Sequence, residues 1–286
     1  MLEFEGVSIA YRVPDGRLLA VEGASASLPE GAIGALVGPS GCGKTSLVQA
    51  AAGLLKPAAG RVLVAGKELR AVRERTAVIF QDFGLLPWKT VEENAELPLL
   101  LRRIPRAERR RRVAPVLEEL GLLPYRSFFP ARLSGGMRQR VAVARALASD
   151  PDLLLMDEPF SSLDALTREG LQESLLSAAR RRRMTVLIVT HSIEEAAFLS
   201  DRAYVMTGRA PGRVCALVEP PAGTDSGGSA DPVASAPPGG DRRGAKPGDS
   251  AMHGPAYRGP AYRGSPLYFE YCVAIRRSLE AAEAGT

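Results

Sequence analysis

The 286-residue sequence contains few aromatic residues, two histidines, three cysteines and no long uninterrupted apolar run. The three cysteines, Cys42, Cys215 and Cys272, are widely spaced and odd in number, which argues against a disulfide framework and fits a reducing compartment. A membrane-spanning helix needs about 18 consecutive apolar residues. The first residues also lack the charged-then-apolar order of a secretory signal. We therefore expect a soluble, cytoplasmic chain.

Lysine is scarce as well, because the 37 basic residues are nearly all arginine; the formal net charge is +5. Such a charge is compatible with anionic partners, whether nucleotides, nucleic acids or lipid headgroups. The arginine runs at 109–112 and 180–183 contain no interleaved aromatic residues. This pattern favours solvated helix faces and does not predict nucleic-acid binding.

Short apolar runs alternate with helical periodicity from residue 1 to about residue 220, the pattern of an α/β domain. Apolar residues recur at helical spacing around 113–120 and again around 171–178. Pro115 lies inside the first of these helices, so we expect a kink or a restart there. Strands are expected at residues 32–37, 78–80, 153–156 and 186–190.

The composition changes abruptly after residue 220. Residues 221–264 are rich in glycine and proline and have no apolar periodicity, so we expect a disordered linker. The pentapeptide GPAYR occurs twice in this stretch, at 254–258 and 259–263. We interpret the repeat as neutral linker, with a docking motif as the alternative.

An amphipathic helix is expected over residues 265–286. Its apolar residues recur at every fourth position and form one stripe, which consists of Leu267, Tyr271, Ile275 and Leu279. Such a stripe needs a covering surface. A flexible linker of this length is long enough to return the helix to its own domain or to bring it to a neighbouring subunit.

A phosphate-binding loop with the pattern G-x-x-x-x-G-K-[ST] follows the expected strand 32–37 and precedes a helical run. Its glycines let backbone N–H groups face phosphates, and the following helix adds the positive end of its dipole. Lys44 is expected to reach the β and γ phosphates, and the Thr45 hydroxyl to ligate Mg²⁺. The predicted nucleotide-binding residues of this loop are Gly38, Pro39, Ser40, Gly41, Cys42, Gly43, Lys44, Thr45 and Ser46.

Two carboxylates, Asp157 and Glu158, directly follow the buried strand 153–156. In phosphoryl-transfer sites one such carboxylate serves the metal ion and the other the attacking water. Asp157 is therefore expected to hold Mg²⁺ and Glu158 to act as the catalytic base. An acidic pair after a strand is also typical of a helix N-cap, but together with the upstream loop it favours an ATP and Mg²⁺ site.

The segment from Leu133 to Arg140, LSGGMRQR, resembles the LSGGQ signature of ATP-binding cassette (ABC) ATPases and lies at the family's spacing before Asp157. Met137 replaces the usual glutamine, a departure common among importer ATPases. The resemblance implies nucleotide contacts from three residues of this motif, namely Ser134, Gly135 and Gly136.

Four further family elements occur in order. Tyr11 has the position that stacks on adenine, with an ordinary strand tyrosine as the alternative. Gln81 matches the Q-loop glutamine, which contacts Mg²⁺ and the attacking water, and Asp164 ends the D-loop sequence SSLD. His191 matches the catalytic switch histidine that contacts the γ-phosphate. The resemblance covers residues 1–220 and implies a P-loop ATPase domain with a RecA-like core and a helical subdomain.

The resemblance also implies partners and a location. Cassettes of this family work as head-to-tail dimers in which each ATP lies between the phosphate loop of one subunit and the signature motif of the other. ATP closes and hydrolysis opens the dimer, which drives membrane permease subunits. We expect a homodimer on the cytoplasmic face of the membrane, served indirectly by a periplasmic or lipoprotein solute-binding protein, and no nucleic-acid partner.

Two stretches, 80–88 (FQDFGLLPW) and 157–168 (DEPFSSLDALTR), resemble the nitrate/sulfonate/taurine importer group, with thiamine-precursor importers close by. Leu85, Leu86 and Trp88 are expected to form an apolar corner that receives the permease, or alternatively a small satellite core. Nothing in an ATPase subunit selects the solute. A separate-subunit exporter or lipid-trafficking ATPase, and a soluble ATPase acting on nucleic acid or ribosomes, are the remaining alternatives.

Overall fold

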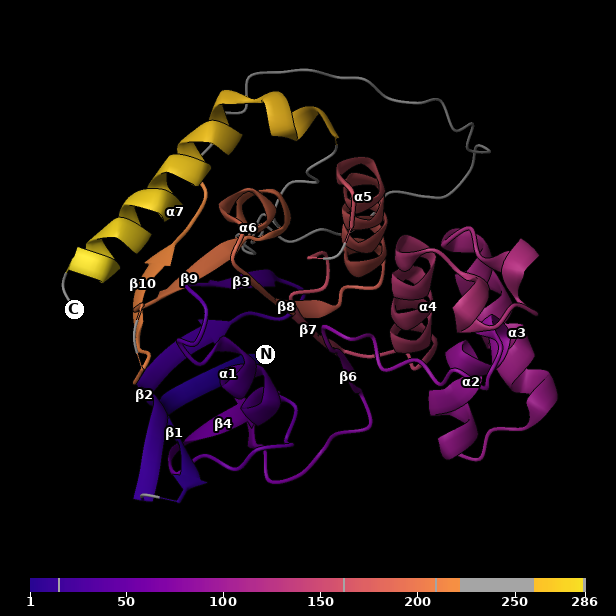
Figure 1. Cartoon of the computed structure of the whole chain (residues 1–286), viewed down its shortest axis with the longest axis horizontal. Helices are drawn as coiled ribbons and strands as arrows, with labels where there is room; N and C mark the ends of the chain where they lie inside the picture. The colour runs from indigo at the N-terminus through magenta and orange to yellow at the C-terminus, as the bar shows by residue number, and fades with distance from the viewer. Residues whose placement is uncertain (15, 162, 209, 222–259, 285–286) are drawn as a thin grey trace, which may run out of the picture.

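The computed structural model describes residues 1–14, 16–161, 163–208, 210–221 and 260–284. Two sheets organise them (Figure 1). A four-stranded antiparallel sheet has the order β2-β1-β4-β5, and a six-stranded sheet has the order β10-β9-β3-β8-β7-β6. The first sheet contains β1 (Leu2–Val13), β2 (Gly16–Leu28), β4 (Ala59–Val64) and β5 (Lys67–Glu68). The second contains β3 (Ile33–Val37), β6 (Thr76–Ile79), β7 (Leu153–Asp157), β8 (Thr185–Thr190), β9 (Arg202–Met206) and β10 (Val214–Val218).

The central strands of the six-stranded sheet explain the uninterrupted apolar runs in the sequence. Every residue of β3, β7 and β8 is buried, and the pairs β3–β8, β8–β7 and β7–β6 are parallel. Parallel strands covered on both faces lose the alternation of polar and apolar residues. The four strands expected from the sequence correspond to β3, β6, β7 and β8, although β6 begins at Thr76 and ends before Phe80.

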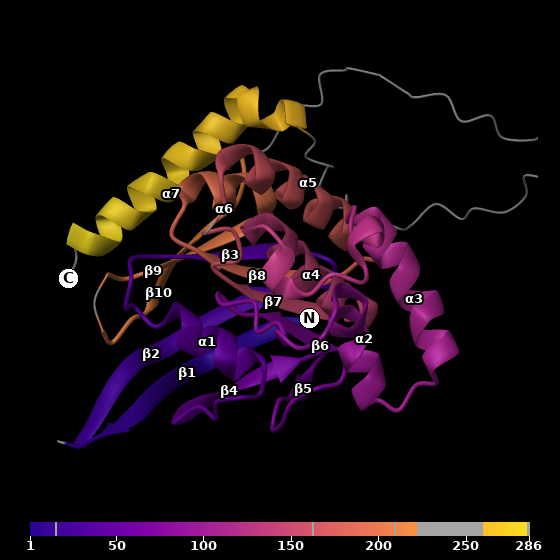
Figure 2. The same ribbon diagram turned by 45° about the vertical axis from the view of Figure 1, so that its right-hand side comes forward.

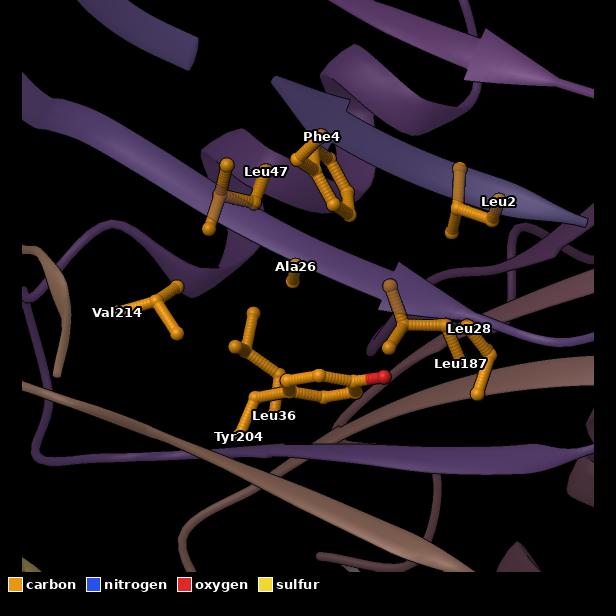
Figure 3. A pocket seen from close by; sticks show the side chains of 9 residues that line it. All are labelled: Leu2, Phe4, Ala26, Leu28, Leu36, Leu47, Leu187, Tyr204 and Val214. Carbon is orange, nitrogen blue, oxygen red and sulfur yellow. The ribbon is translucent and has the colours of Figure 1, made fainter. Parts of the chain in front are cut away.

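An apolar layer joins the two sheets, with α1 (Lys44–Ala51) between them (Figure 2). Figure 3 shows its centre, where side chains from both sheets and from α1 point toward one another. The space between these side chains is too small for a ligand, so the feature is core packing. The lining residues are Leu2, Phe4, Ala26, Leu28, Leu36, Leu47, Leu187, Tyr204 and Val214.

A group of helices lies beside the sheets and forms the helical subdomain that the resemblance implies (Figure 1). The group consists of α2 (Val91–Leu101), α3 (Arg106–Glu119) and α4 (Gly135–Ala148), with the short 3₁₀ turns η1 (Leu123–Tyr125) and η2 (Pro130–Arg132) between the last two. Thr90 and Glu93 form a reciprocal capping box at the start of α2. The remaining helices of the main body are α5 (Ala165–Arg181) and α6 (Ile193–Leu199).

The expected restart at Pro115 is wrong, because α3 runs without interruption from Arg106 to Glu119. A proline in a helix removes one backbone hydrogen bond. Val113, Val116 and Leu117 on either side of Pro115 are buried against the rest of the helical group, and this packing holds the backbone in the helix.

The chain ends in α7 (Pro266–Ala284), which lies across α6, β9 and β10 (Figure 1). Tyr268, Tyr271 and Ile275 are buried beneath it. The Tyr271 hydroxyl donates a hydrogen bond to the Val218 carbonyl oxygen at 3.2 Å, and it lies 3.3 Å from the Ser200 hydroxyl. The terminal helix therefore covers its own domain, which is one of the two destinations that the linker length allows.

Residues 222–259 of the expected linker lie outside the described residues, but its last part differs from the expectation. Residues 260–264 form the 3₁₀ turn η3 (Pro260–Gly264). The Arg263 guanidinium lies 3.7 Å above the Phe198 ring and donates to the Gln172 side-chain oxygen at 2.6 Å. Tyr262 packs edge-on against Tyr268. Residues 260–263, which belong to the second GPAYR pentapeptide, are therefore ordered by contacts with distant residues, which composition does not reveal.

Candidate nucleotide-binding site

The predicted catalytic and phosphate-binding residues gather at one edge of the six-stranded sheet. The phosphate loop follows β3, and His191 follows β8. Asp157 is the last residue of β7 and Glu158 comes directly after it, while Gln81 comes two residues after β6. These four strands are parallel neighbours in the order β3-β8-β7-β6, so their carboxyl ends meet at the same edge. Ligands of open α/β sheets bind at this edge.

The phosphate loop has the backbone geometry that a close approach to phosphate needs. Gly43 caps α1 with φ of 94°, in the left-handed region that only glycine adopts freely. A Cβ atom at Gly43 would also lie 2.4 Å from the Val21 side chain. Ser40, Gly41 and Thr45 are exposed on the outer side of the loop, whereas Cys42 and Lys44 are buried beneath it.

Lys44 occupies the centre of the loop. Its ammonium group donates hydrogen bonds to the carbonyl oxygens of Gly38 and Pro39, both at 2.8 Å, and it is 3.9 Å from the Cys42 sulfur. Burial raises the pKa of the Cys42 thiol, so this cysteine is a packing residue and not a nucleophile. The positive charge is thus held inside a ring of backbone groups.

Asp157 and Thr45 meet beside the loop and present oxygen atoms only. Asp157 is 6% exposed, and burial raises the pKa of its carboxyl group, an effect opposed by a hydrogen bond from Thr45 and by the Lys44 charge. Oxygen ligands are those that Mg²⁺ prefers, and it uses one or two carboxylates together with phosphate oxygens. The residues present therefore fit this ion.

Glu158 and His191 face each other across the ends of β7 and β8, with 3.4 Å between Oε2 and Nδ1. Glu158 has φ of 45°, and its backbone N–H donates to the Val189 carbonyl oxygen at 2.9 Å. This backbone bond turns the Glu158 side chain away from the sheet and toward His191. Both side chains lie at one small cleft, together with Ser161 and Ser192.

Tyr11 and Gln81, the other predicted site residues of the same chain, differ in how firmly they are held. Tyr11 is half-buried in β1, and its hydroxyl lies 2.9 Å from that of Ser46, so the ring is held next to the start of α1. Gln81 is exposed in the loop after β6. The next part of this loop is fixed to α4, since Arg145 donates hydrogen bonds to the carbonyl oxygens of Phe83 and Gly84.

Among the described residues, no hydrogen bond or ion pair links the signature motif or the D-loop to the phosphate loop of the same chain. Ser134 caps α4, and Asp164 caps α5 by accepting from the Thr167 N–H at 3.0 Å; both residues are exposed. Helix α4 belongs to the group with α2 and α3, which lies apart from α1 in both views (Figures 1 and 2). Gly136 contacts α5 closely, because a Cβ atom there would lie 2.4 Å from Thr167 Cγ2.

Sequence reasoning missed three residues that support the site. Gly212, in the loop between β9 and β10, lies against Cys42. Arg168 and Glu195 lie on the far wall of the cleft that contains Glu158 and His191. Charged residues on helices usually indicate solvated faces, and only the near-complete burial of Glu195 distinguishes it.

The fold, the phosphate loop and the paired carboxylates Asp157 and Glu158 at the sheet edge are those of a P-loop ATPase. Residues 21–161 match the family described as ABC transporter. The taurine import ATP-binding protein of Rhizobium johnstonii is 44% identical over 217 residues, which cover 76% of this chain and 82% of that protein. The nitrate import ATP-binding protein of Synechococcus elongatus is 39% identical over 222 residues, which cover 77% and 81%.

Solved structures give the same result. A dimeric ATP-binding cassette in a post-hydrolysis state with ADP and Pi superposes with a TM-score of 0.67 at 30% identity, covering 77% of this chain and 98% of that one. The chain belongs to the ABC transporter family, as one of its ATP-binding subunits, and it is an ATPase. Within the described residues, none of the helices combines the length and apolar character needed to cross a bilayer.

Proposed function

We propose that this chain is the ATP-hydrolysing subunit of a bacterial ABC importer for nitrate, a sulfonate, taurine or a similar small solute. The observation that carries the proposal is the similarity to taurine and nitrate import ATP-binding proteins over about four-fifths of their length. The subunit would lie on the cytoplasmic face of the membrane, bound to permease subunits that receive solute from a binding protein.

The separation of the two nucleotide-facing surfaces supports a homodimer. Ser134 and Asp164 are exposed, and within the described part of the chain no hydrogen bond joins either residue to the phosphate loop. A second copy placed head-to-tail would bring its Ser134, Gly135 and Gly136 to the ATP bound at Lys44. Each site would then be complete only in the closed dimer.

The residues at the sheet edge have separable roles in this proposal. Lys44 binds the β and γ phosphates, and Glu158 positions and deprotonates the attacking water. His191, 3.4 Å from Glu158, contacts the γ-phosphate. Thr45, Asp157 and Gln81 would hold Mg²⁺, which neutralises the charge that develops on the phosphate oxygens. The Tyr11 ring would stack on adenine.

The surface of the helical subdomain offers a place for the permease. A cleft there is lined by Trp88 and Phe129 together with charged residues that include Glu93, Arg106 and Arg110. Trp88 is 70% exposed and Phe129 is 44% exposed. The cleft lies on the helical group that follows the Gln81 loop, so a permease segment bound in it would sense the nucleotide site.

Uptake measurements test the importer assignment. A host strain without this gene should lose uptake of one labelled solute among nitrate, taurine and an alkanesulfonate. The wild-type gene should restore uptake, whereas Glu158→Gln should not. Unchanged uptake of these solutes combined with impaired efflux of any substrate would overturn the proposal in favour of an exporter.

A further inference from the structure

A buried hydrogen-bonded chain holds the turn that carries His191. The Thr190 hydroxyl donates to Glu195 Oε2 at 2.6 Å and accepts from the Ser192 N–H at 3.0 Å. The Glu195 N–H in turn donates to the Ser192 hydroxyl at 3.1 Å. His191 lies between Thr190 and Ser192, so its backbone is fixed on both sides by groups that depend on the Glu195 carboxylate.

Glu195 is an unusual residue for such a role, because it is only 8% exposed. Burying a carboxylate is costly unless hydrogen bonds or a charge compensate for it. Burial raises the pKa of Glu195, and the Thr190 hydrogen bond and the Arg168 charge oppose this effect. The two compensating groups come from different elements, β8 and α5.

Arg168 extends the chain to the D-loop. One of its terminal nitrogens, Nη2, donates to the Leu163 carbonyl oxygen at 2.7 Å, and Leu163 immediately precedes Asp164. Its Nε lies 3.8 Å from Glu195 Oε1. This Nε is buried and has no hydrogen-bond partner within the described residues. A movement of roughly 1 Å would bring it within hydrogen-bond distance of the carboxylate.

The outer side of the D-loop is open to a second subunit. Asp164 is exposed, and Leu166 in the first turn of α5 is 83% exposed. Thr167, in the same turn, packs against the signature residue Gly136. A subunit that binds this surface would contact the same α5 turn that carries Arg168.

We propose that Arg168 and Glu195 are positioning residues that couple the D-loop to His191 of the same subunit. Contact of the D-loop with the partner subunit closes the gap between Arg168 and Glu195. The carboxylate then fixes Thr190 and the His191 turn in the geometry for hydrolysis. The inference rests on the two-subunit site of the proposed function, and it adds two residues that lie outside the phosphate loop and the paired carboxylates.

Steady-state ATPase kinetics of the full chain test this coupling. Arg168→Ala and Thr190→Val should each lower kcat by about 10-fold, because a misplaced catalytic group costs rate. KM for ATP should stay within about twofold, because the phosphate loop is untouched. Thr190→Ser keeps the hydroxyl and should retain the wild-type kcat. Arg181→Ala, which removes an exposed arginine from the same helix, is the matched control.

The double variant Arg168→Ala/Thr190→Val separates coupling from two independent effects. Arg168 and Thr190 are connected only through Glu195 in this network, so the double variant should have the kcat of the slower single variant. Multiplicative losses would overturn the proposal. Glu195→Gln repeats the Arg168 test if Arg168→Ala fails to fold, since an amide still accepts from Thr190 but lacks the charge.

Two further measurements keep this proposal distinct from the function on which it rests. Arg168→Ala and Thr190→Val each remove a group that compensates the buried carboxylate and should lower the melting temperature, but the affinity for a fluorescent ATP analogue should be unchanged in every single variant. A loss of ATP affinity in parallel with kcat would indicate a purely structural role and overturn the coupling. Glu158→Gln is assayed alongside. A wild-type rate in Glu158→Gln refutes the catalytic site itself, whereas inactive Glu158→Gln with fully active Arg168→Ala refutes only the coupling.

Discussion

Gly212 lies directly against Cys42 of the phosphate loop, and a Cβ atom at Gly212 would be 1.9 Å from the Cys42 carbonyl oxygen. Two backbone hydrogen bonds of 2.9 Å, from Gly212 N–H to Ala20 and from Glu22 N–H to Gly212, fix this approach. The loop between β9 and β10 and the strand β2 therefore form a wall behind the phosphate loop. The phosphate-binding backbone is supported from two sheets.

Gly212→Ala should disturb ATP binding without touching the nucleotide. The added methyl group must push the phosphate loop outward, and such overpacking costs about 1–3 kcal/mol of stability. We expect a lower melting temperature and a smaller increase in melting temperature on addition of Mg·ATP. Gly170→Ala is the control, because a Cβ atom there meets nothing within 4 Å. If Mg·ATP raised the melting temperature equally in both variants and in the wild type, Gly212 would not support the phosphate loop.

Lys44→Ala should abolish most ATP binding and turnover. The lysine is buried and held by two carbonyl oxygens of the loop, so its charge is directed at the loop. Nucleotide titration by fluorescence anisotropy measures the loss. Lys56→Ala, which removes an exposed lysine beyond the end of α1, should bind ATP normally. Normal affinity in Lys44→Ala would show that the nucleotide binds elsewhere.

Glu158→Gln should bind ATP and accumulate an ATP-bound dimer, because in the proposed function it loses only the carboxylate that activates water. The amide keeps the shape of the side chain beside His191. Size-exclusion chromatography with and without Mg·ATP shows the dimer, and a coupled assay shows the loss of phosphate release. A variant that stays monomeric with ATP bound would contradict the head-to-tail site.

Part of the candidate site follows from local sequence signals, because Glu158 and His191 directly follow buried strands and Lys44 lies in the glycine-rich loop after β3. Lys44, Glu158 and His191 have neighbours along the chain that identify them, and parallel strands bring their carboxyl ends together. Gly212 gives no such signal. It lies beside Cys42 only because β9 pairs with β3, which no local pattern specifies.

Residues 260–284 also show that local sequence patterns do not reveal long-range contacts. The four-residue spacing of Tyr271 and Ile275 predicted a helix, but residues 260–264 were assigned to linker on composition. Their order depends on the Phe198 ring and the Gln172 side chain, which are 65 and 91 residues from Arg263 in the chain. The composition of a short segment cannot predict contacts between residues so far apart in the chain.

The loop that carries Trp88 allows the two interpretations of the apolar corner to be separated. Leu85 packs against the main core, whereas Trp88 is 70% exposed. Asn94 fixes the backbone between them, donating to the carbonyl oxygens of Leu86 and Lys89 at 3.1 and 2.9 Å. Leu85 is thus half-buried against the core, whereas the Trp88 side chain is exposed and can contact a partner.

Trp88→Ser should leave the melting temperature and ATP binding unchanged and should weaken co-purification with the permease. Leu101→Ser, which also replaces an exposed apolar residue of the helical subdomain, is the control and should keep the permease bound. Pull-down from detergent-solubilised membranes measures recovery. Full recovery with Trp88→Ser would place the permease contact on another surface.

The last prediction concerns α7. Tyr271 is fully buried beneath this helix, and its hydroxyl bonds to Val218. Truncating a buried aromatic side chain costs about 3–5 kcal/mol, so Tyr271→Ala should lower the melting temperature strongly. Phe269→Ala, on the exposed face of the same helix, should change stability by about 0.5 kcal/mol or less. Removal of 260–286 should have an effect at least as large as that of Tyr271→Ala, because it uncovers β10 and α6.

Replacement of residues 222–259 by a Gly/Ser chain of equal length completes this comparison. Its composition predicts no packed contacts, so the replacement should keep the wild-type melting temperature and ATPase rate. Differential scanning fluorimetry and a coupled ATPase assay measure both quantities for the wild type, the two point variants, the deletion and the Gly/Ser replacement. If the Gly/Ser replacement is damaging while removal of 260–286 is harmless, the function of the terminal region lies in the linker sequence and not in the helix that covers α6.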